Sequence, residues 1–235
     1  MRGLFVTGTD TGVGKTILSA ALLAAMAAAG ERVSAHKPAV TGLDDRSDTG
    51  WPPDHELLAN VAGMTPEEVA PLRYGPAVSP HLAARLAGET INPDELIACA
   101  RAAGTDDSTL IVEGVGGLLV PLTDEFTVRD LATELGLPVL IAAKPGLGTI
   151  NHTLLTLDAA RSAGLDVRAV VLTPWPEQTS ELERSNRETI ARMGDIEVAG
   201  LGQVRSPAPA DLARAGDALP WRNWLPFESP VPRRP

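Results

Sequence analysis

Residues 4–16 read LFVTGTDTGVGKT and decide the fold of this chain. An apolar run typical of a buried strand comes first, a glycine-rich turn follows, and Gly14-Lys15-Thr16 begins an alanine- and leucine-rich stretch typical of a helix. Successive backbone N–H groups point into such a turn, and the helix N-terminus adds partial positive charge, so the turn is suited to bind phosphates. The stretch therefore predicts a phosphate-binding P-loop.

The loop also indicates the kind of phosphate ligand. Lys15 is placed to reach the β- and γ-phosphates of a nucleotide, and the Thr16 hydroxyl is placed to ligate Mg²⁺. Five residues separate Gly8 from Gly14, where the common P-loop has four, and the absence of a G-x-G-x-x-G argues against a Rossmann dinucleotide site. Asp10 stands where partition-type ATPases of the same superfamily carry a lysine.

The rest of the chain alternates short apolar runs with longer helical patterns. The apolar runs predict strands at 4–8, 33–38, 110–115, 139–144, 170–173 and 198–204. The helical patterns cover 16–29, 55–62, 66–70, 80–87, 93–103, 128–135, 149–163 and 182–193. This alternation predicts an α/β P-loop NTPase fold of three layers with a mainly parallel central sheet. No linker divides the chain, so residues 1–235 are expected to form a single domain.

Two segments depart from this pattern. Residues 41–53 are polar and turn-rich, and we expect them to form a surface loop near the strand ends. The Pro-rich terminal segment 206–235 contains Trp221, Trp224 and Phe227. We expect these aromatic side chains to dock the segment on the domain, with a frayed end at 233–235.

Composition and charge exclude several classes of protein. Hydrophobic residues make up 44% and charged residues 21%, which is a globular composition. The formal net charge is −10, so a nucleic acid is not an expected partner. Cys99 is the only cysteine, which excludes an internal disulfide and a cysteine-based zinc site. The apolar runs are too short to span a membrane and the start does not resemble a signal peptide, so we expect a cytoplasmic protein.

Three charged residues outside the P-loop are candidates for the same site. Lys37 ends the second predicted strand, where its ammonium could stabilise charge on a transferred phosphoryl group or simply be solvated. Glu113 precedes the run Gly114-Val115-Gly116-Gly117 in the manner of a Walker B carboxylate, with a strand-end salt bridge as the alternative. Asp54, on the residues alone, is best interpreted as the N-cap of a helix.

Four spaced motifs go beyond a general P-loop protein. They are G-T-D-T-x-V-G-K-T at 8–16, K-P-x-x-T-G at 37–42, V-E-G-x-G-G-L at 112–118 and L-G-T-x-N-H at 147–152. In sequence, order and spacing they resemble the motifs of the dethiobiotin synthetase family, in which the five-residue gap of the P-loop is normal. The resemblance covers most of the chain.

The resemblance implies an ATP-dependent ligase of biotin biosynthesis. Its substrate is 7,8-diaminopelargonate, one amine of which takes up CO₂ as a carbamate. ATP phosphorylates the carbamate to a mixed anhydride, and the second amine displaces phosphate to close the ureido ring of dethiobiotin. In family terms Lys15 and Lys37 serve catalysis, and Thr16, Asp54 and Glu113 hold Mg²⁺, which replaces the N-cap interpretation of Asp54.

The resemblance also implies which residues bind the two substrates. The nucleotide would contact Gly12, Val13, Gly14, Lys15, Thr16, Ile17, Asp54, Glu113, Gly114, Val115, Gly116, Thr173 and Pro174. The diamine would contact Thr11, Lys37, Thr41, Gly116, Gly117, Leu147, Gly148 and Asn151. The family acts as a homodimer, and residues 147–151 resemble the segment that receives the substrate carboxylate from across the interface. A predicted helix start at Gly148-Thr149 suits that role.

One position departs from the family pattern. Many members carry Asn-Asp after the 170–172 strand, and the asparagine amide is expected to read adenine, whereas this chain has Thr173-Pro174. The co-substrate is therefore ATP or another nucleoside triphosphate.

Two other functions remain as alternatives. The first is a partition-type ATPase switch, for which Asp10 and the acidic charge are unfavourable. The second is a cobyrinate-type amidoligase, which carries a glutaminase domain for which 235 residues leave no room.

Overall fold

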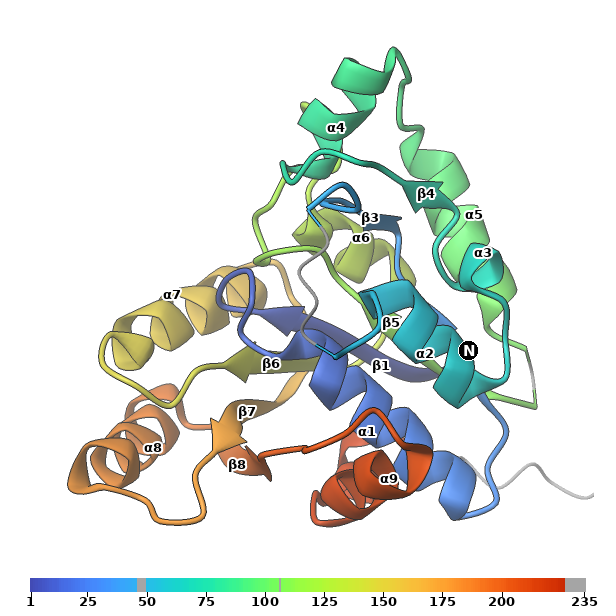
Figure 1. Cartoon of the computed structure of the whole chain (residues 1–235). Helices are drawn as coiled ribbons and strands as arrows, with labels where there is room; N and C mark the ends of the chain where they lie inside the picture. The colour runs from blue at the N-terminus through green and yellow to red at the C-terminus, as the bar shows by residue number, and fades with distance from the viewer. Residues whose placement is uncertain (46–49, 106, 227–235) are drawn as a thin grey trace, which may run out of the picture.

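The fold is built on a six-stranded sheet in which every strand is parallel to its neighbours. The computed structural model describes residues 1–45, 50–105 and 107–226. In spatial order the strands are β2 (Val33–His36), β5 (Thr109–Glu113), β1 (Arg2–Gly8), β6 (Val139–Ala143), β7 (Val167–Trp175) and β8 (Glu197–Gly202). The expected mainly parallel sheet is confirmed, and β1 lies near its centre (Figure 1).

Helices cover both faces of this sheet and complete the three expected layers. The core on one face includes side chains of α1 (Lys15–Ala28), α2 (Asp54–Ala62), α3 (Pro66–Val69), α9 (Pro209–Asp217) and α10 (Trp221–Trp224). The core on the other face includes side chains of α4 (Pro80–Ala87), α5 (Pro93–Ala103), α6 (Val128–Leu135), α7 (Thr149–Ser162) and α8 (Glu181–Gly194). No helix of the described residues is long and apolar enough to cross a lipid bilayer.

The parallel arrangement decides where a site can form. Parallel strands have their carboxyl ends on one edge of the sheet, and ligands of such sheets bind along that edge. β1 pairs with β5 from Arg2 opposite Thr109 to Val6 opposite Glu113, and β5 pairs with β2 from Thr109 opposite Val33 to Val112 opposite His36. The P-loop, Glu113 and Lys37 therefore follow three adjacent strands at the same edge.

The sequence patterns missed four short elements. β3 (Ala39–Val40) and β4 (Leu72–Arg73) form a separate two-stranded parallel sheet, and each is too short for periodicity to show. The helices α9 and α10 lie in the Pro-rich terminal segment. In α9, a Cβ on Gly216 would lie 2.0 Å from the carbonyl oxygen of Ala21, so α9 packs on α1 at a distance that only glycine permits. Helices α1 and α9 lie side by side in Figure 1.

The terminal segment docks as its aromatic residues predict. Trp221 and Trp224 are each 1% exposed and belong to the same core as α1. Trp224 also donates a hydrogen bond from Nε1 to Glu197 Oε2 at 3.2 Å. Phe227 and residues 233–235 lie outside the described residues.

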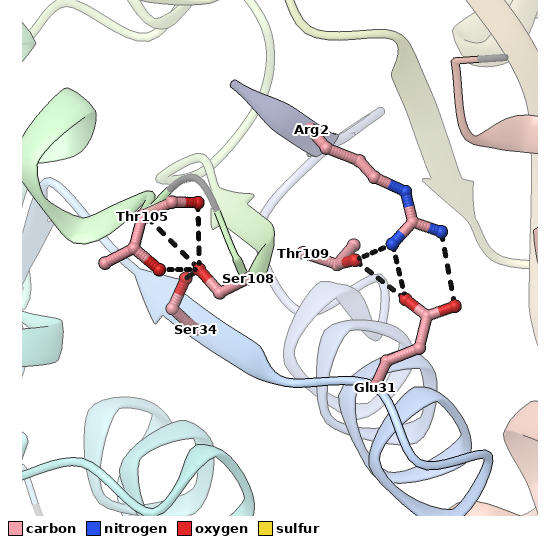
Figure 2. Close-up of polar contacts among 6 residues, drawn as sticks. All are labelled: Arg2, Glu31, Ser34, Thr105, Ser108 and Thr109. Atoms are coloured by element: carbon pink, nitrogen blue, oxygen red, sulfur yellow. Dashed lines mark hydrogen bonds and ion pairs between the residues drawn. The ribbon is translucent and has the colours of Figure 1, made fainter. Parts of the chain in front are cut away.

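A polar cluster ties the amino ends of the strands together (Figure 2). Arg2 at the start of β1 donates to both carboxylate oxygens of Glu31 and to the Thr109 hydroxyl, which itself donates to Glu31 at 2.7 Å. Beside it, the hydroxyls of Ser34 and Ser108 lie 3.1 Å apart and join β2 to the turn before β5. Burial alone would raise the pKa of Glu31, but its hydrogen bonds from Arg2 and Thr109 outweigh burial and hold that pKa below its ordinary value.

We predict that Glu31→Gln lowers the free energy of unfolding by about 1–2 kcal/mol at neutral pH, because it removes a charge-assisted hydrogen bond. A carboxyl whose pKa is lowered by folding stabilises the native state above its unfolded pKa and loses that contribution as the pH falls through its folded pKa. The difference from wild type should therefore shrink below pH 4.5, the ordinary glutamate value. Urea unfolding at several pH values measures this difference, with Glu188→Gln as the control because Glu188 is exposed. An equal loss of unfolding free energy in Glu31→Gln and Glu188→Gln would contradict the stabilising role of the Glu31 hydrogen bonds.

Candidate active site

The P-loop begins α1 with backbone groups free to receive an anion. Gly14 is the N-cap residue of α1, with φ 93° and no side chain to occupy the helix N-terminus. The Lys15 side chain is buried, and its Nζ donates a hydrogen bond to the Asp10 carbonyl at 2.9 Å. Burial lowers the pKa of Lys15 more than Glu113 and Asp54 raise it. The loop thus presents backbone N–H groups and one buried amine at the edge of the sheet.

A charged centre lies directly beside the P-loop. The Lys37 ammonium donates to Asp54 Oδ2 at 2.7 Å and to Glu113 Oε1 at 2.5 Å. The Thr16 hydroxyl donates to the same Glu113 oxygen at 2.8 Å. β5, α1, α2 and the residue that follows β2 therefore each contribute one side chain to a single cluster. Of the two sequence alternatives, Lys37 is not a solvated strand-end lysine, since its side chain is 5% exposed.

The protonation states of this centre follow from its charges. Burial alone would lower the pKa of Lys37, but the carboxylates of Asp54 and Glu113 outweigh burial and raise that pKa above its ordinary value. The Lys37 ammonium in turn does most to hold the pKa of Asp54 below its usual range. The carboxylates therefore favour the charged form of Lys37, which is suited to stabilise negative charge.

The carboxylates fit a Mg²⁺ ion that also binds phosphate. Glu113 is fully buried, and its Oε2 has no hydrogen-bond partner among the described residues, which is costly unless a cation or donor binds there. The Asp54 side chain is 48% exposed and lines the cavity described below. Within the described residues, no group of three or more His, Cys, Asp or Glu could hold a metal alone. A hydroxyl and two carboxylates completed by phosphate oxygens are the ligands that Mg²⁺ prefers.

Asp54 corrects the local sequence interpretation. It is the first residue of α2, and the N-cap is Pro53. The carboxylate bonds to Lys37, as described above. The side chain is thus aimed at the charged centre, as the resemblance implies.

A cavity of about 680 Å³ opens over this centre. Most of the predicted site residues of the P-loop and of the neighbouring strand ends line it: Thr11, Gly12, Gly14, Lys15, Thr16, Ile17, Lys37, Thr41, Asp54, Val115 and Gly116. The walls also include residues that the sequence did not indicate: Ala39, Val40, Trp51, Pro52, Leu57, Ala77, Val78, Ser79, Pro80 and Val120. β3 and β4 explain part of this wall, because their pairing brings residues 39–44 against 72–78, a contact with no motif of its own.

Other predicted residues lie close to the cavity without lining it. Val13 is buried in the core beneath the loop, and Glu113 forms the charged centre. A Cβ built on Gly114 would meet Val128, and one built on Gly117 would lie 3.5 Å from the carbonyl oxygen of Gly8. The run after β5 thus packs directly on the P-loop.

The predicted base-reading position lies against the phosphate loop. Thr173 is 2% exposed, and a Cβ built on Gly14 would lie 2.7 Å from its γ-methyl. Pro174 follows within β7 and is exposed. Neither residue lines the 680 Å³ cavity. The Thr173 side chain therefore packs on the P-loop.

The predicted carboxylate segment lies apart from the cavity of its own chain. Gly148 is the N-cap residue of α7, with φ 90°, so this helix N-terminus also lacks a capping side chain. Leu147 is 92% exposed, Asn151 is exposed, and Leu155 one turn later is 62% exposed. Leu147, Gly148 and Asn151 do not line the 680 Å³ cavity. By contrast, α3, α6 and α8 begin with capping boxes that occupy their first N–H groups.

Sequence comparisons find relatives that match most of this chain. A family model described as an AAA domain matches residues 2–205. The ATP-dependent dethiobiotin synthetase BioD of Mycobacterium sp. (strain KMS) is 41% identical over 232 residues, which cover 96% of this chain and 98% of the relative. The protein of the same name from Anaeromyxobacter sp. (strain Fw109-5) is 44% identical over 211 residues, which cover 88% and 93%.

A solved structure gives the same fold. The MinC:MinD cell division protein complex of Aquifex aeolicus has a TM-score of 0.52 at 15% identity, with 93% of this chain and 87% of that chain covered. At this identity the likeness shows a shared P-loop fold alone. The sequence relatives are much closer and span nearly the whole chain, so this chain belongs to the family of ATP-dependent dethiobiotin synthetases.

Proposed function

We propose that the chain forms a single domain, acts as a homodimer, and closes a ureido ring on 7,8-diaminopelargonate with CO₂ and a nucleoside triphosphate. One amine attacks CO₂ to form a carbamate, and a carbamate oxygen takes the γ-phosphoryl group with release of the nucleoside diphosphate, which is ADP when ATP is used. The second amine then attacks the carbonyl carbon, and phosphate leaves as the ring closes. The observation that carries the proposal is the charged centre of Lys37, Asp54 and Glu113, which lies beside the P-loop.

The two lysines act on negative charge in different places. Lys15 begins α1 and is placed for the phosphates, while Lys37 lies in the cavity wall that continues to Thr41. The Lys37 ammonium would stabilise negative charge on the carbamate and on the transferred phosphoryl group. The protons of the amines leave to phosphate or water.

Thr16, Asp54 and Glu113 are the residues that would hold Mg²⁺. The ion, when bound, supplies charge neutralisation and orientation of the phosphates. The unpaired Glu113 oxygen supports this assignment. A cation on these oxygens would also compete with the Lys37 ammonium, which shares Glu113 Oε1 with Thr16.

The substrate carboxylate requires a positive group outside this cavity. The N-terminus of α7 is suited to bind it, because no side chain caps this helix and Asn151 is exposed in its first turn. Leu147 and Leu155 supply exposed apolar surface around these groups. We therefore place the carboxylate of one chain's substrate on the α7 N-terminus of the other chain.

No observation favours the partition-type ATPase over this function. The likeness to the MinC:MinD complex concerns the fold, and Asp10 occupies the position of the lysine that such switches use. Incorporation of isotopic CO₂ that depends on the diamine distinguishes the two functions directly.

We predict that Glu113→Gln and Asp54→Asn each lower Mg²⁺-dependent turnover about 100-fold, because amides replace carboxylates poorly as ligands of a hard cation. Steady-state assays across a Mg²⁺ titration measure the effect, with circular dichroism as a check on folding. Glu56→Gln is the matched control, since Glu56 is also acidic and lies in the first turn of α2 but does not line the cavity. Near wild-type activity of either variant at saturating Mg²⁺ would exclude that residue as a ligand.

We predict loose selection of the nucleotide base. Pro174 has no N–H group, and the Thr173 side chain is packed on Gly14 and cannot offer the paired donor and acceptor of an asparagine amide. Values of kcat/KM for ATP, GTP, CTP and UTP measure the selection. A preference for ATP of a hundredfold or more would require ~2.7 kcal/mol of base-specific contacts and would contradict the prediction.

We predict that each active site is completed by two chains. Lys15→Ala and Asn151→Ala should each be nearly inactive alone, because each removes one half of every site. In co-refolded mixtures about half of the dimers are mixed, and one of the two sites in each carries both lesions while the other is intact. The mixture should therefore recover about a quarter of wild-type activity.

The control mixture pairs Lys15→Ala with Asp54→Asn, which line the same cavity of one chain. Here every site carries a lesion, and no activity should return. Mass spectrometry confirms that mixed dimers have formed. If the mixture of Lys15→Ala with Asn151→Ala is then no more active than either variant alone, the prediction that two chains complete each site is wrong.

A further inference from the structure

A buried amide on α8 supports the loop that precedes α7. Asn186 lies in the middle of α8 and is 5% exposed. Its Nδ2 donates two hydrogen bonds, to the carbonyl oxygens of Pro145 at 2.9 Å and Gly146 at 3.1 Å. A buried amide is costly unless its hydrogen bonds are made, so these two bonds explain why a polar side chain occupies this buried position.

One of these two carbonyls, that of Gly146, also bonds to the first turn of α7. The Gly146 oxygen also accepts a hydrogen bond from the Thr149 backbone N–H at 3.3 Å. Gly148 lies between them in a left-handed conformation and is the N-cap residue of α7. Asn186, Gly146 and Thr149 therefore form one hydrogen-bonded chain that ends at the helix N-terminus.

The loop itself has little to hold it in place. Residues 144–148 join β6 to α7 and read Lys-Pro-Gly-Leu-Gly. Two glycines make this backbone costly to order, and Leu147 is 92% exposed. Support from outside the loop is therefore needed if the N–H groups of α7 are to keep one orientation.

We propose that Asn186 is a positioning residue for the substrate carboxylate, which it serves by fixing the Pro145 and Gly146 carbonyls and through them the N-terminus of α7. This inference rests on the proposed function, in which that N-terminus receives the carboxylate of the substrate bound to the other chain. Asn186 touches the loop and not the reacting groups, so its loss should weaken binding of the diamine acid and leave the phosphate chemistry intact.

Two variants remove the hydrogen bonds in different ways. Asn186→Asp keeps the shape of the side chain and loses both donors, and Asn186→Ser is too short to reach the loop. The matched control is Ile190→Ala, because Ile190 lies one turn later on α8, is fully buried, and belongs to the core on the same face of the sheet. Thermal unfolding of all three variants reports the general loss of stability.

The readout is a division between KM and kcat for two substrates. One is 7,8-diaminopelargonate, and the other is 2,3-diaminononane, which has the same carbon chain and diamine but no carboxylate. Asn186→Asp and Asn186→Ser should raise KM for the acid roughly 10- to 100-fold, with KM for the nucleotide, kcat and all values for 2,3-diaminononane within about threefold of wild type. Ile190→Ala should lower Tm without changing KM for the acid.

Three results would overturn the inference. An unchanged KM for the acid in folded Asn186→Asp and Asn186→Ser would exclude the positioning role. A similar rise in KM for the acid in Ile190→Ala, or an equal rise for both substrates in the Asn186 variants, would show a general structural effect. Absence of diamine-dependent turnover in the wild type would overturn the proposed function and this inference with it, and is distinguished from the other results because it does not depend on any variant.

Discussion

The fully buried carboxylate of Glu113 is the constraint on which the rest of the site depends. Removing such a charge from water costs on the order of several kcal/mol, and the structure offsets this cost with the Lys37 ammonium and the Thr16 hydroxyl on one oxygen. The other oxygen is left without a partner among the described residues. The centre lies where the carboxyl ends of β2 and β5 meet the start of α1, so the parallel sheet brings its side chains together.

The helices of this structure differ in how their N-termini are capped. α3, α6 and α8 begin with capping boxes, in which a hydroxyl and an acidic side chain occupy the first backbone N–H groups. α1 and α7 begin instead at Gly14 and Gly148, both left-handed and without a side chain. An uncapped N-terminus sacrifices about 1 kcal/mol of helix stability and retains its capacity to bind an anion. In α1 and α7 the two glycines therefore leave the helix N-terminus without a side-chain cap, and the anions that we propose for these N-termini are the nucleotide phosphates and the substrate carboxylate.

Much of this could be predicted from the sequence, for definite physical reasons. Strands buried on both faces read as apolar runs, and a Gly-Lys-Thr helix start has a local signature, so the sheet, most helices and the P-loop were predicted correctly. Asp54 shows the limit, because its neighbours indicate a helix N-cap while its actual partner is Lys37. The cavity wall at 77–80 was missed, since it depends on the pairing of two-residue strands. Contacts between distant segments leave no periodic pattern to detect.

The position of Thr173 shows how the phosphate and base ends of the nucleotide site are linked. Its methyl group lies against Gly14, where a Cβ would collide with it, so the end of β7 supports the P-loop by direct packing. A side chain that fills this space cannot also extend outward to hydrogen-bond a base. At the next position Pro174 offers no N–H to replace the lost contact. In this chain the strand end therefore packs on the phosphate loop, and this packing is the structural ground for the loose base selection that we propose.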